Sequence, residues 1–428
     1  MLDLKMLRAD PETVRKGIAA KGETADLDRW LEMDEERRAA LLEWENGRAE
    51  LNRAGPLIAA AKKEGRDASE AIANMKAVKA RGQELKARID TLDGEMEAIL
   101  IRVPNLPAAD VPVGPDETGN VEVDLWGEKR ELDFEPKAHW DLGKDLDILD
   151  LEAGGKVGGS GFPILKGAGA RLERALIQFM LDLHTEEHGY REVSAPYLAR
   201  PETMVTCGQI PKLEEDMYRC RDDELYLIPT AEVPLTNLHR DEILDGARLP
   251  LRYVGHTPCF RREAGAAGRD TRGLIRVHQF HKVELVTFAE EGKSDEELNK
   301  LRGHAEEVLR RLGLHYRTLL LCTGDMSFAG RRTYDLEVWA PGVGKYLEVS
   351  SCTVFGDFQA RRANTRYRDG DGKLRIAHTM NGSGLALPRT VIAIMETYQR
   401  ADGTIDVPEA LVPYMGGRTR IGGGEESE

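Results

Sequence analysis

Apolar residues recur at alternating three- and four-residue intervals along residues 75–103, and this heptad pattern restricts the fold more than any other feature. The pattern is interrupted only at Gly82 and contains Met75, Val78, Leu85, Ile89, Leu92, Met96, Ile99 and Val103. A weaker version precedes it, with Trp30, Trp44, Leu51 and Ile58 at one heptad position and Leu27 and Leu41 at the other. Because the polar turn KKEGRDASEA separates the two, we predict a long antiparallel helical hairpin, a coiled-coil arm, over about residues 27–103.

The composition changes after this arm. Residues 103–120 are rich in Pro, Gly and Asp, which is typical of a linker. Beyond them, strand-like runs such as LRYVG and VELVTF mix with three amphipathic stretches near 168–187, 294–312 and 384–399, and a hairpin turn occurs in WAPGVGKY. We therefore expect an α+β fold with a helical domain at 1–103, a linker at 104–120, an antiparallel α+β domain at 121–416 and a disordered tail at 417–428.

The net charge and the cysteines indicate the cellular compartment and exclude some classes of partner. The formal net charge of -15 and the pI near 5.3 argue against non-specific DNA binding, and no apolar run has the length of a membrane span. The five cysteines (Cys207, Cys220, Cys259, Cys322 and Cys352) form no CxxC pair. We expect a cytoplasmic protein without DNA or membrane partners.

The distal part of the arm is basic within this acidic chain. Residues 51–90 hold nine Lys or Arg against five acids, a local net charge of +4. Either a solvated coiled-coil face or an RNA-binding surface would account for this surplus. The candidate RNA contacts are Arg53, Lys62, Lys63, Arg66, Lys76 and Lys79.

Three short patterns resemble known motifs without the context that those motifs need. HTEEH at 184–188 matches a zinc-protease pattern, but it closes a helix and no third ligand is apparent. His278 and His281 lie in strand-like sequence, where residues three apart point to opposite faces. GAGARL at 167–172 lacks the preceding strand and the downstream acid of a dinucleotide site. We expect no zinc site.

A cluster of fixed cations occurs at 260–286, FRREAGAAGRDTRGLIRVHQFHKVELV, which contains five arginines. We interpret it as a strand through CFRRE, a loop, and a returning strand from Ile275. Arginines at a strand end grip phosphate bidentately, Glu263 offers an acceptor for an exocyclic amine, and Phe280 offers a flat face for a base. The alternative is an arginine-rich hairpin held by surface ion pairs, which explains neither the glycines nor the phenylalanine.

Two further stretches suit a nucleotide. In LEVSS, Glu348 and Ser351 offer hard oxygen ligands for one Mg²⁺. The alternative is that they are ordinary half-buried polar residues of a strand. In MNGSGLALPRTVIAIMETYQ, a Gly-rich entry precedes an apolar helix with Arg389 in its first turn. A helix N-terminus beside an arginine suits a terminal phosphate, whereas a plain core helix would not need the glycines.

Taken together, these stretches resemble the sequence motifs of class II aminoacyl-tRNA synthetases. FRRE with its following arginines is similar to their second motif, LEVSS with GLALPR to their third, and GARLERALIQFMLDLHTEEHGYREVSAPYL to their first, the dimer interface. LIPTAEVPLTN, GRDTRGLIRVHQF, TYDLEVW, DFQARR and NGSGLA resemble seryl-tRNA synthetases of type 1 in particular. The resemblance covers essentially the whole chain, arm included.

This resemblance implies a fold and a reaction. The fold would be a central antiparallel sheet flanked by helices, preceded by an arm that binds tRNA. The reaction would join L-serine to ATP as seryl-adenylate with release of pyrophosphate, and then esterify the 3′-terminal adenosine of tRNA(Ser). The implied partners are L-serine, ATP with Mg²⁺, tRNA(Ser) and a second copy in a homodimer, with tRNA(Sec) as a further candidate.

The resemblance also assigns site residues by position. The implied serine site contains Thr230, Ala231, Glu232, Arg261, Glu284 and Ser383. The implied ATP site contains Arg261, Arg262, Glu263, Val277, Phe280, Glu348, Val349, Ser350, Ser351 and Arg389, with Mg²⁺ at Glu348 and Ser351. Arg261 would hold the α-phosphate and the serine carboxylate, Phe280 would lie under the adenine beside Val277, and Arg389 would take the terminal phosphate.

Several positions depart from the family pattern. Pro56 stands in the arm where a Gly-Pro pair replaces the usual Ser-Lys, and we expect it to kink that helix. Cys207 replaces a usual threonine and Arg332 a usual lysine. Two alternatives stay open: an amino acid:carrier-protein ligase, which would lack the arm, and a non-catalytic RNA-binding paralogue, which would have lost the motif arginines or the Thr230 and Glu284 pair.

Overall fold

The computed structural model of the protein describes residues 1–264 and 271–423, which form two compact units. The smaller unit contains residues 2–19 and 23–104. The larger contains residues 1 and 20–22 and the chain from Asn105 onward. The two units divide between Pro104 and Asn105, and the linker at 104–120 stays a prediction. Within the described residues, no helix is both long and apolar enough to cross a membrane.

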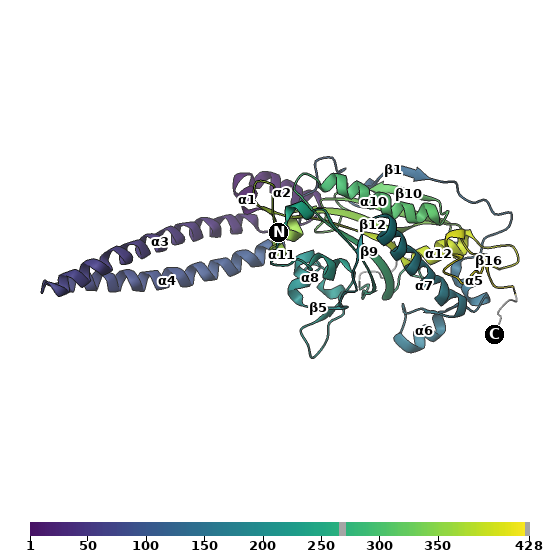
Figure 1. The fold of residues 1–428 in the computed structure, drawn as a ribbon, viewed down its shortest axis with the longest axis horizontal. Helices are drawn as coiled ribbons and strands as arrows, with labels where there is room; N and C mark the ends of the chain where they lie inside the picture. The colour runs from purple at the N-terminus through teal and green to yellow at the C-terminus, as the bar shows by residue number, and fades with distance from the viewer. Residues whose placement is uncertain (265–270, 424–428) are drawn as a thin grey trace. The chain divides into compact units, whose positions relative to one another are not determined.

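The smaller unit is built on an antiparallel helical hairpin, as the heptad pattern predicts. Two short helices, α1 (Leu4–Ala9) and α2 (Pro11–Ala20), precede the long pair α3 (Leu27–Lys63) and α4 (Ser69–Leu100), which lie side by side in Figure 1. Trp30 and Leu92 are fully buried in the seam. The second helix is shorter than expected because α4 ends at Leu100, although Val103 beyond it is still buried.

Polar pairs fix the register of the hairpin. The Arg88 guanidinium bonds to Glu36, Arg81 to Glu43 and Asn74 to Glu50, so that contacts recur every seven residues along both helices. Exposed pairs of this kind contribute little stability each. Their regular spacing selects one alignment of the two helices.

Gly82, where the heptad pattern is interrupted, faces Trp44 of the other helix. A Cβ placed on Gly82 would lie 3.9 Å from the Trp44 indole, which is ordinary van der Waals contact. Pro56 does not end the helix, because α3 continues through it to Lys63; the kink that we expect there stays a prediction.

The larger unit contains an eight-stranded sheet with the strand order β1-β10-β11-β12-β15-β9-β8-β4. All neighbours are antiparallel except β4 and β8, which confirms the predicted fold class of an antiparallel sheet flanked by helices. The strands are β1 (Val121–Trp126), β4 (Arg191–Glu192), β8 (Leu251–Phe260), β9 (Gln279–Ala289), β10 (Tyr316–Leu320), β11 (Arg332–Ala340), β12 (Lys345–Gly356) and β15 (His378–Ala386).

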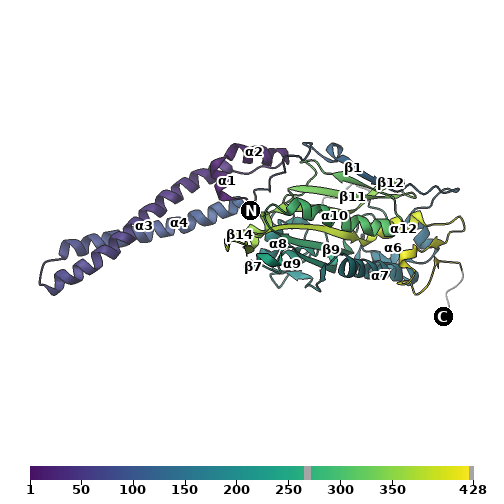
Figure 2. The ribbon, with the colours of Figure 1, turned by 45° about the horizontal axis from the view of Figure 1, so that its top comes forward.

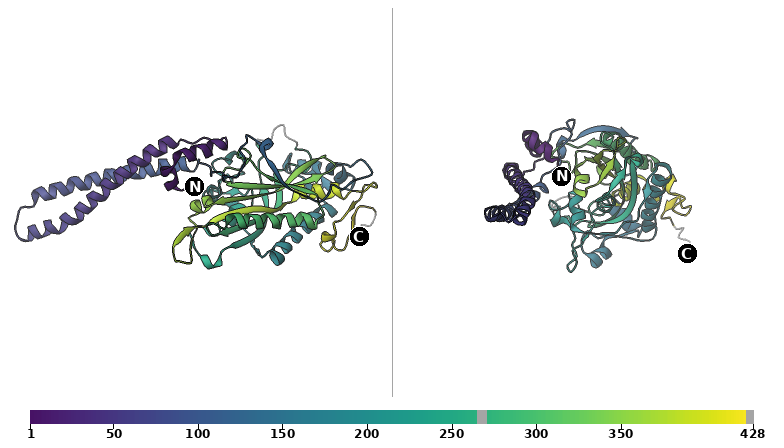
Figure 3. Two further views of the ribbon diagram at one scale, coloured as in Figure 1. Left: turned by 90° about the horizontal axis from the view of Figure 1, so that it is seen from above. Right: turned by 60° about the vertical axis from the view of Figure 1, so that its left-hand side comes forward.

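Three long helices cover this sheet, close to the expected ranges. They are α7 (Gly167–Asp182), which continues as a π-turn over Leu183–Glu187, α10 (Ser294–Arg311) and α12 (Leu387–Thr397). Figure 3 shows α10 running along the strands, and Leu301 of α10 approaches Gly382 and Cys352 on one face of the sheet. Side chains at alternate positions of the same strands point to the opposite face, where they are free to line a site.

Shorter elements complete the larger unit. The helices are α5 (His139–Asp145), α6 (Leu151–Gly158), α8 (Pro201–Cys207), α9 (Glu232–Thr236) and α11 (Phe358–Ala363). Small sheets are formed by β2 (Leu149–Asp150) with β3 (Ile164–Leu165), β5 (Leu198–Ala199) with β6 (Tyr226–Leu227), and β7 (Ile243–Asp245) with β13 (Arg366–Arg368) and β14 (Leu374–Ile376). Figure 2 shows β7 and β14 together at one end of this unit.

Three expectations need correction. The strand expected from Ile275 begins only at Gln279, and the strand expected to include Arg261 ends at Phe260. The stretch predicted as a linker packs within the larger unit, where Leu106, Ala108 and Val111 are buried. The tail is ordered at residues 417–423, where β17 (Arg420–Ile421) pairs with β16 (Ile405–Asp406); residues 424–428 lie outside the described part.

The buried seam of the hairpin gives a first prediction. Replacing Leu92, which is fully buried, with alanine should destabilise the hairpin by about 3 kcal/mol, because removal of the side chain leaves a cavity between the helices. Hydrogen exchange of the full chain would measure this as faster exchange across α4. The matched change Leu57→Ala removes a side chain that is 70% exposed and should leave the exchange of both helices unchanged. Equal protection in the two variants would contradict this packing.

Candidate functional site

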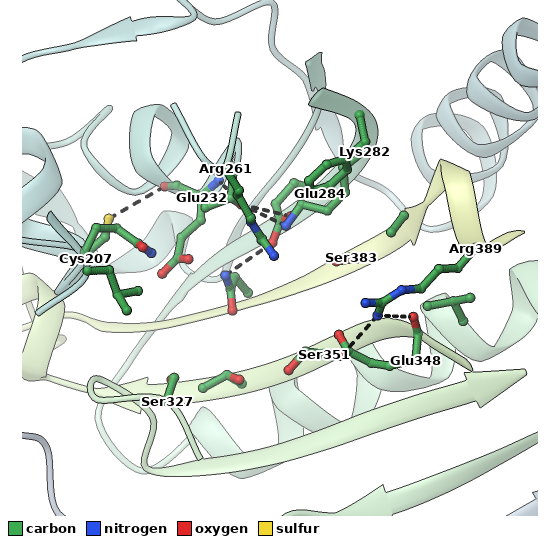
Figure 4. A pocket seen from close by; sticks show the side chains of 18 of the residues that line it. Cys207, Glu232, Arg261, Lys282, Glu284, Ser327, Glu348, Ser351, Ser383 and Arg389 are labelled. Atoms are coloured by element: carbon green, nitrogen blue, oxygen red, sulfur yellow. Dashed lines mark hydrogen bonds and ion pairs between the residues drawn. The ribbon is translucent and has the colours of Figure 1, made fainter. Parts of the chain in front are cut away.

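A cavity of about 350 Å³ lies on the face of the sheet opposite α10. Its walls come from β9, β12 and β15, from the start of α12, and from Arg261, which follows β8. Figure 4 shows the labelled side chains along it: Glu348 and Arg389 stand toward one end, Arg261 and Glu284 near the middle, and Cys207 with Ser327 toward the other end. A cavity of this size suits a small organic substrate.

The middle of the cavity is organised around the Glu284 carboxylate on β9. Glu284 pairs directly with Ser383 in the β9–β15 register, so both side chains point to the cavity. Its Oε1 accepts from Asn381 Nδ2 at 3.2 Å, and its Oε2 accepts from the Thr230 hydroxyl at 3.2 Å and forms an ion pair with Lys282 Nζ. Glu284 is 1% exposed, so its negative charge is held by these three donors rather than by water.

Two β-bulges give the strand residues their directions. The pairing of β9 with β15 skips Gly384, directly after Ser383. The pairing of β11 with β12 skips Val349, so Glu348 and Ser351 both line the cavity although they are three residues apart. In a regular strand, residues at that spacing point to opposite faces. The bulge therefore brings the two predicted Mg²⁺ ligands to one side.

Arginines define the rest of the cavity. The Arg261 guanidinium lies 5.2 Å from the centre of the Phe280 ring, and its Nε donates to the Pro229 carbonyl. Arg389, in the first turn of α12, donates from Nη1 to the Glu348 carbonyl oxygen at 2.8 Å and to its carboxylate at 3.3 Å. Both guanidiniums keep donors that are directed to the cavity, which suits phosphate oxygens.

Burial changes the acidity of two groups at this site. Glu232 is 7% exposed, and burial, followed by the neighbouring Glu284 carboxylate, raises its pKa to about 7. Its Oε1 accepts from Gln359 Nε2 at 2.7 Å. Burial, followed by Glu232, also raises the pKa of the Cys207 thiol well above its usual value, so this thiol is neutral and a poor nucleophile.

The structure brings most of the predicted site residues together but not all of them. Those that line the cavity are Thr230, Glu232, Arg261, Glu263, Val277, Phe280, Glu284, Glu348, Val349, Ser351, Ser383 and Arg389. The other three lie outside the lining. Ala231 is fully buried beside α9, Arg262 donates to the Glu215 carbonyl at the surface, and the Ser350 hydroxyl donates to the Ser383 carbonyl behind the cavity wall.

Sequence reasoning missed two residues that hold Glu284 in place. Lys282 precedes Glu284 by two residues on β9, and Asn381 precedes Ser383 by two residues on β15. Because side chains two apart share one face of a strand, this spacing was a signal that could have found both. Arg276 is a third addition: it lines the cavity and pairs with Glu263 at 2.6 Å.

The predicted RNA contacts of the arm are exposed along α3, α4 and the turn between them. Arg66 pairs with Glu64, and Arg53 donates to the Ala49 carbonyl of its own helix. Within residues 1–264 and 271–423, Lys62, Lys63, Lys76 and Lys79 form no ion pair. These four ammonium groups therefore offer their charge to solvent or to a ligand.

The zinc-like pattern has a packing role in the described structure. His184 and His188 contact each other through their Nδ1 atoms at 2.9 Å, and a Cβ on Gly384 would lie 2.8 Å from His184 Nε2. His184 thus packs against the bulge beside Ser383. The part of the chain that the structure describes contains no group of three or more His, Cys, Asp or Glu side chains arranged to hold a metal.

Comparisons with known proteins agree on one family. The model of the seryl-tRNA synthetase N-terminal domain matches residues 1–107, and that of the class II tRNA synthetase core domain (G, H, P, S and T) matches residues 216–398. The serine–tRNA ligase of Caldanaerobacter subterraneus is 54% identical over 97% of this chain and 98% of its own length. That of Clostridium tetani is 50% identical over 98% of this chain and all of its own length.

Solved structures show the same likeness. The crystal structure of seryl-tRNA synthetase from Pyrococcus horikoshii complexed with ATP superposes with a TM-score of 0.93 at 38% identity, covering 98% of this chain and 99% of the other. The cytoplasmic serine–tRNA ligase from Naegleria fowleri in complex with AMP superposes with a TM-score of 0.87 at 27% identity, covering 99% of both chains.

The buried Glu232 gives a prediction on pH. Because its pKa is raised from 4.5 to about 7 on folding, the stabilisation by its neutral form is fully present below about pH 4.5 and is lost as the pH rises through about 7. The shift corresponds to about 3 kcal/mol. Glu232→Gln keeps an acceptor for Gln359 and should raise the thermal midpoint relative to the wild type increasingly between pH 5 and pH 7.5. The change Glu192→Gln, at an exposed carboxylate, serves as the control. Parallel pH profiles for the wild type and Glu232→Gln would contradict the assignment.

Proposed function

The chain belongs to the seryl-tRNA synthetase family, and we propose that the cavity of the larger unit is where it activates serine and charges tRNA. Its activity is that of a serine–tRNA ligase, a two-step enzyme with ATP as a substrate. The observation that carries the residue assignments is the buried Glu284 carboxylate opposite Ser383, within the same cavity as Arg261 and Arg389.

The Glu284 environment supports serine as the amino acid. A carboxylate offers about four acceptor positions. Asn381, Thr230 and Lys282 occupy three of them, which leaves one directed to the cavity for the serine hydroxyl. Alanine and glycine have no hydroxyl and would leave this acceptor desolvated and unpaired, a penalty that rejects them strongly. Ser383 and Thr230 line the same part of the cavity as Glu284.

Arg261 and Arg389 support adenylate formation in the part of the cavity that we assign to ATP. With Arg261 on the α-phosphate and Arg389 on the terminal phosphate, a serine carboxylate oxygen attacks the α-phosphorus in line, a new P–O bond forms and pyrophosphate leaves. Phe280 and Val277 face the adenine, and Glu263 accepts from its amino group. Positioning and charge stabilisation carry such phosphoryl chemistry without a covalent nucleophile. In the second step a ribose hydroxyl of the terminal adenosine attacks the serine carbonyl, and AMP leaves.

The residues on β12 fit a magnesium ion that arrives with ATP. The Glu348 carboxylate and the Ser351 hydroxyl stand on one side of the strand because of the bulge at Val349. Two hard oxygen ligands suit Mg²⁺, which keeps several waters and binds substrate phosphates. When bound, the ion would neutralise charge on the leaving pyrophosphate, while Arg389 holds the Glu348 side chain in place.

The proposal extends to the partners. The exposed lysines of the arm, residues 1–103, would bind the backbone of tRNA(Ser), and we include tRNA(Sec) as a second possible acceptor. The helix α7 would contribute to a homodimer, as the resemblance of its sequence to the first class II motif implies. The five cysteines are free thiols, which supports a reducing cytoplasm. The match of the N-terminal model to residues 1–107 disfavours a carrier-protein ligase without an arm.

The amino-acid assignment is tested by ATP–pyrophosphate exchange with each of the twenty amino acids. We expect exchange with serine, and at least 100-fold less with alanine or glycine because the Glu284 acceptor is then unpaired. Glu284→Gln should abolish exchange, since an amide cannot hold the Lys282 charge or offer the same acceptor. The control Glu122→Gln alters an exposed carboxylate of β1 and should exchange normally. Exchange that is equal with alanine would sink this role for Glu284.

The role of the arm gives a separate prediction. Changing Lys62, Lys63, Lys76 and Lys79 together to alanine should weaken tRNA binding and reduce the slope of log affinity against log salt by about one for every phosphate that a lysine no longer neutralises. Serine-dependent exchange without tRNA should stay unchanged. A control change, Lys300→Ala, removes a cation that is already paired with Glu296 and Glu297. An unchanged salt slope in the quadruple variant would show that the arm does not bind the tRNA backbone through these lysines.

A further inference from the structure

A buried histidine–carboxylate pair lies outside the cavity, at the contact of α5 with α12. His139 begins α5 and Glu396 stands near the end of α12, and both side chains are fully buried. His139 Nδ1 lies 2.8 Å from Glu396 Oε1. Glu396 belongs to the stretch MNGSGLALPRTVIAIMETYQ that carries Arg389, but neither it nor His139 was assigned to the site from the sequence, and neither lines the cavity.

The contacts of Glu396 fix the tautomer of His139. Glu396 Oε1 also accepts from the His139 backbone N–H, and its Oε2 accepts from the backbone N–H groups of Gly342 and Val343 at 2.8 and 3.1 Å. Four N–H groups thus converge on the Glu396 carboxylate, which accepts from all of them. The His139 proton that faces this carboxylate stands on Nδ1, and Nε2 is left as an acceptor, as the bond from the Leu274 backbone N–H requires.

That acceptor is used by the segment 272–277, which forms a wall of the cavity. The Leu274 backbone N–H donates to His139 Nε2 at 3.0 Å. Four residues of this segment line the cavity: Leu274, Ile275, Arg276 and Val277. The segment belongs to no helix or strand, so the regular hydrogen bonds of secondary structure do not hold it in place. Gly273, with φ of +68°, lets the backbone approach the imidazole, because a Cβ there would lie 2.2 Å from His139 Nε2.

Helix α12, which carries Glu396, also holds the segment 272–277 at a second point. The Ile275 carbonyl accepts from Arg389 Nε at 3.2 Å. Arg389 and Glu396 are seven residues apart on α12, so they lie on one side of the helix two turns apart. The wall segment is thus attached to α12 through the backbone of two successive residues, directly by Arg389 and through His139 by Glu396.

We propose that His139 and Glu396 are positioning residues for the nucleotide, which act through the Leu274 backbone to hold the segment 272–277 against the ATP side of the cavity. This inference rests on the proposed function in that it assigns the cavity to ATP. It adds a pair of residues that touch no substrate but set the place of the residues expected to contact the nucleotide. Their loss should weaken ATP binding while leaving the serine end, built on β9 and β15, unaffected.

The test compares two replacements of His139 by calorimetric titration of the full chain with ATP. His139→Asn places an amide near Nδ1, keeps the bond to Glu396 and removes the acceptor for Leu274; we expect the Kd for ATP to rise about fivefold to tenfold, the effect of removing one hydrogen bond. His139→Gln extends a carbonyl oxygen toward the place of Nε2 and should recover most of the affinity. The control His315→Asn changes another buried histidine, which bonds Gly127 and Tyr346 away from the cavity, and should not alter the Kd.

A second variant tests the same contact without altering His139, in case His139→Asn folds poorly. Gly273→Ala pushes the segment off the imidazole without changing the buried pair, and it should raise the Kd for ATP in the same way. In the double variant the two effects should not add, because both break one contact. Additive effects, an unchanged Kd, or a Kd for serine that rises as much as that for ATP would overturn the proposal. Absence of serine-dependent exchange in a wild type that still binds ATP would instead refute the proposed function alone.

Discussion

The register between β9 and β15 is the constraint on which the site depends. It sets Glu284 directly opposite Ser383 and places Lys282 and Asn381 on the same face. A slip of β9 by one residue would turn Lys282 and Glu284 toward α10 and present the apolar side chains of Val283 and Leu285 to the cavity. The residue after Ser383 is Gly384, which forms a bulge in the pairing of β9 with β15. Because His184 and Val283 leave no space for a side chain there, the bulge helps to fix the alignment of the two strands.

Charge balance inside the cavity follows from the same alignment. Glu284 and Glu232 are buried close to each other, and the pKa of Glu232 is raised to about 7, first by burial and then by this neighbouring charge. Lys282 bonds both Glu284 and the Thr230 hydroxyl, so one ammonium group orients the two side chains that we propose to recognise serine. Buried charges that are paired in this way cost stability unless every partner is present. Such a cluster is therefore better explained by its function than by the stability of the fold.

Much of this organisation is readable in the sequence. The heptad spacing predicts the hairpin, and the resemblance carried by FRRE, LEVSS, GLALPR and their companion motifs predicts twelve of the residues that line the cavity. What the sequence could not show depends on backbone irregularity. The bulge at Val349, which turns Glu348 and Ser351 to one side, leaves no sign in the residues themselves. The sequence of residues 275–277 suggests a strand because two of the three are β-branched. In the structure the Ile275 carbonyl accepts from Arg389 and the preceding Leu274 N–H donates to His139, and these residues belong to no strand.

The most direct test of the central claim is a crystal structure of the protein with a non-hydrolysable analogue of seryl-adenylate. The account predicts that the serine hydroxyl lies within about 3 Å of Glu284, as a hydrogen bond requires. It also predicts that Arg261 contacts the group in the place of the α-phosphate and that the adenine stacks on Phe280. An analogue bound with its serine end away from Glu284, or outside the cavity on this face of the sheet, would contradict the assignment of the site.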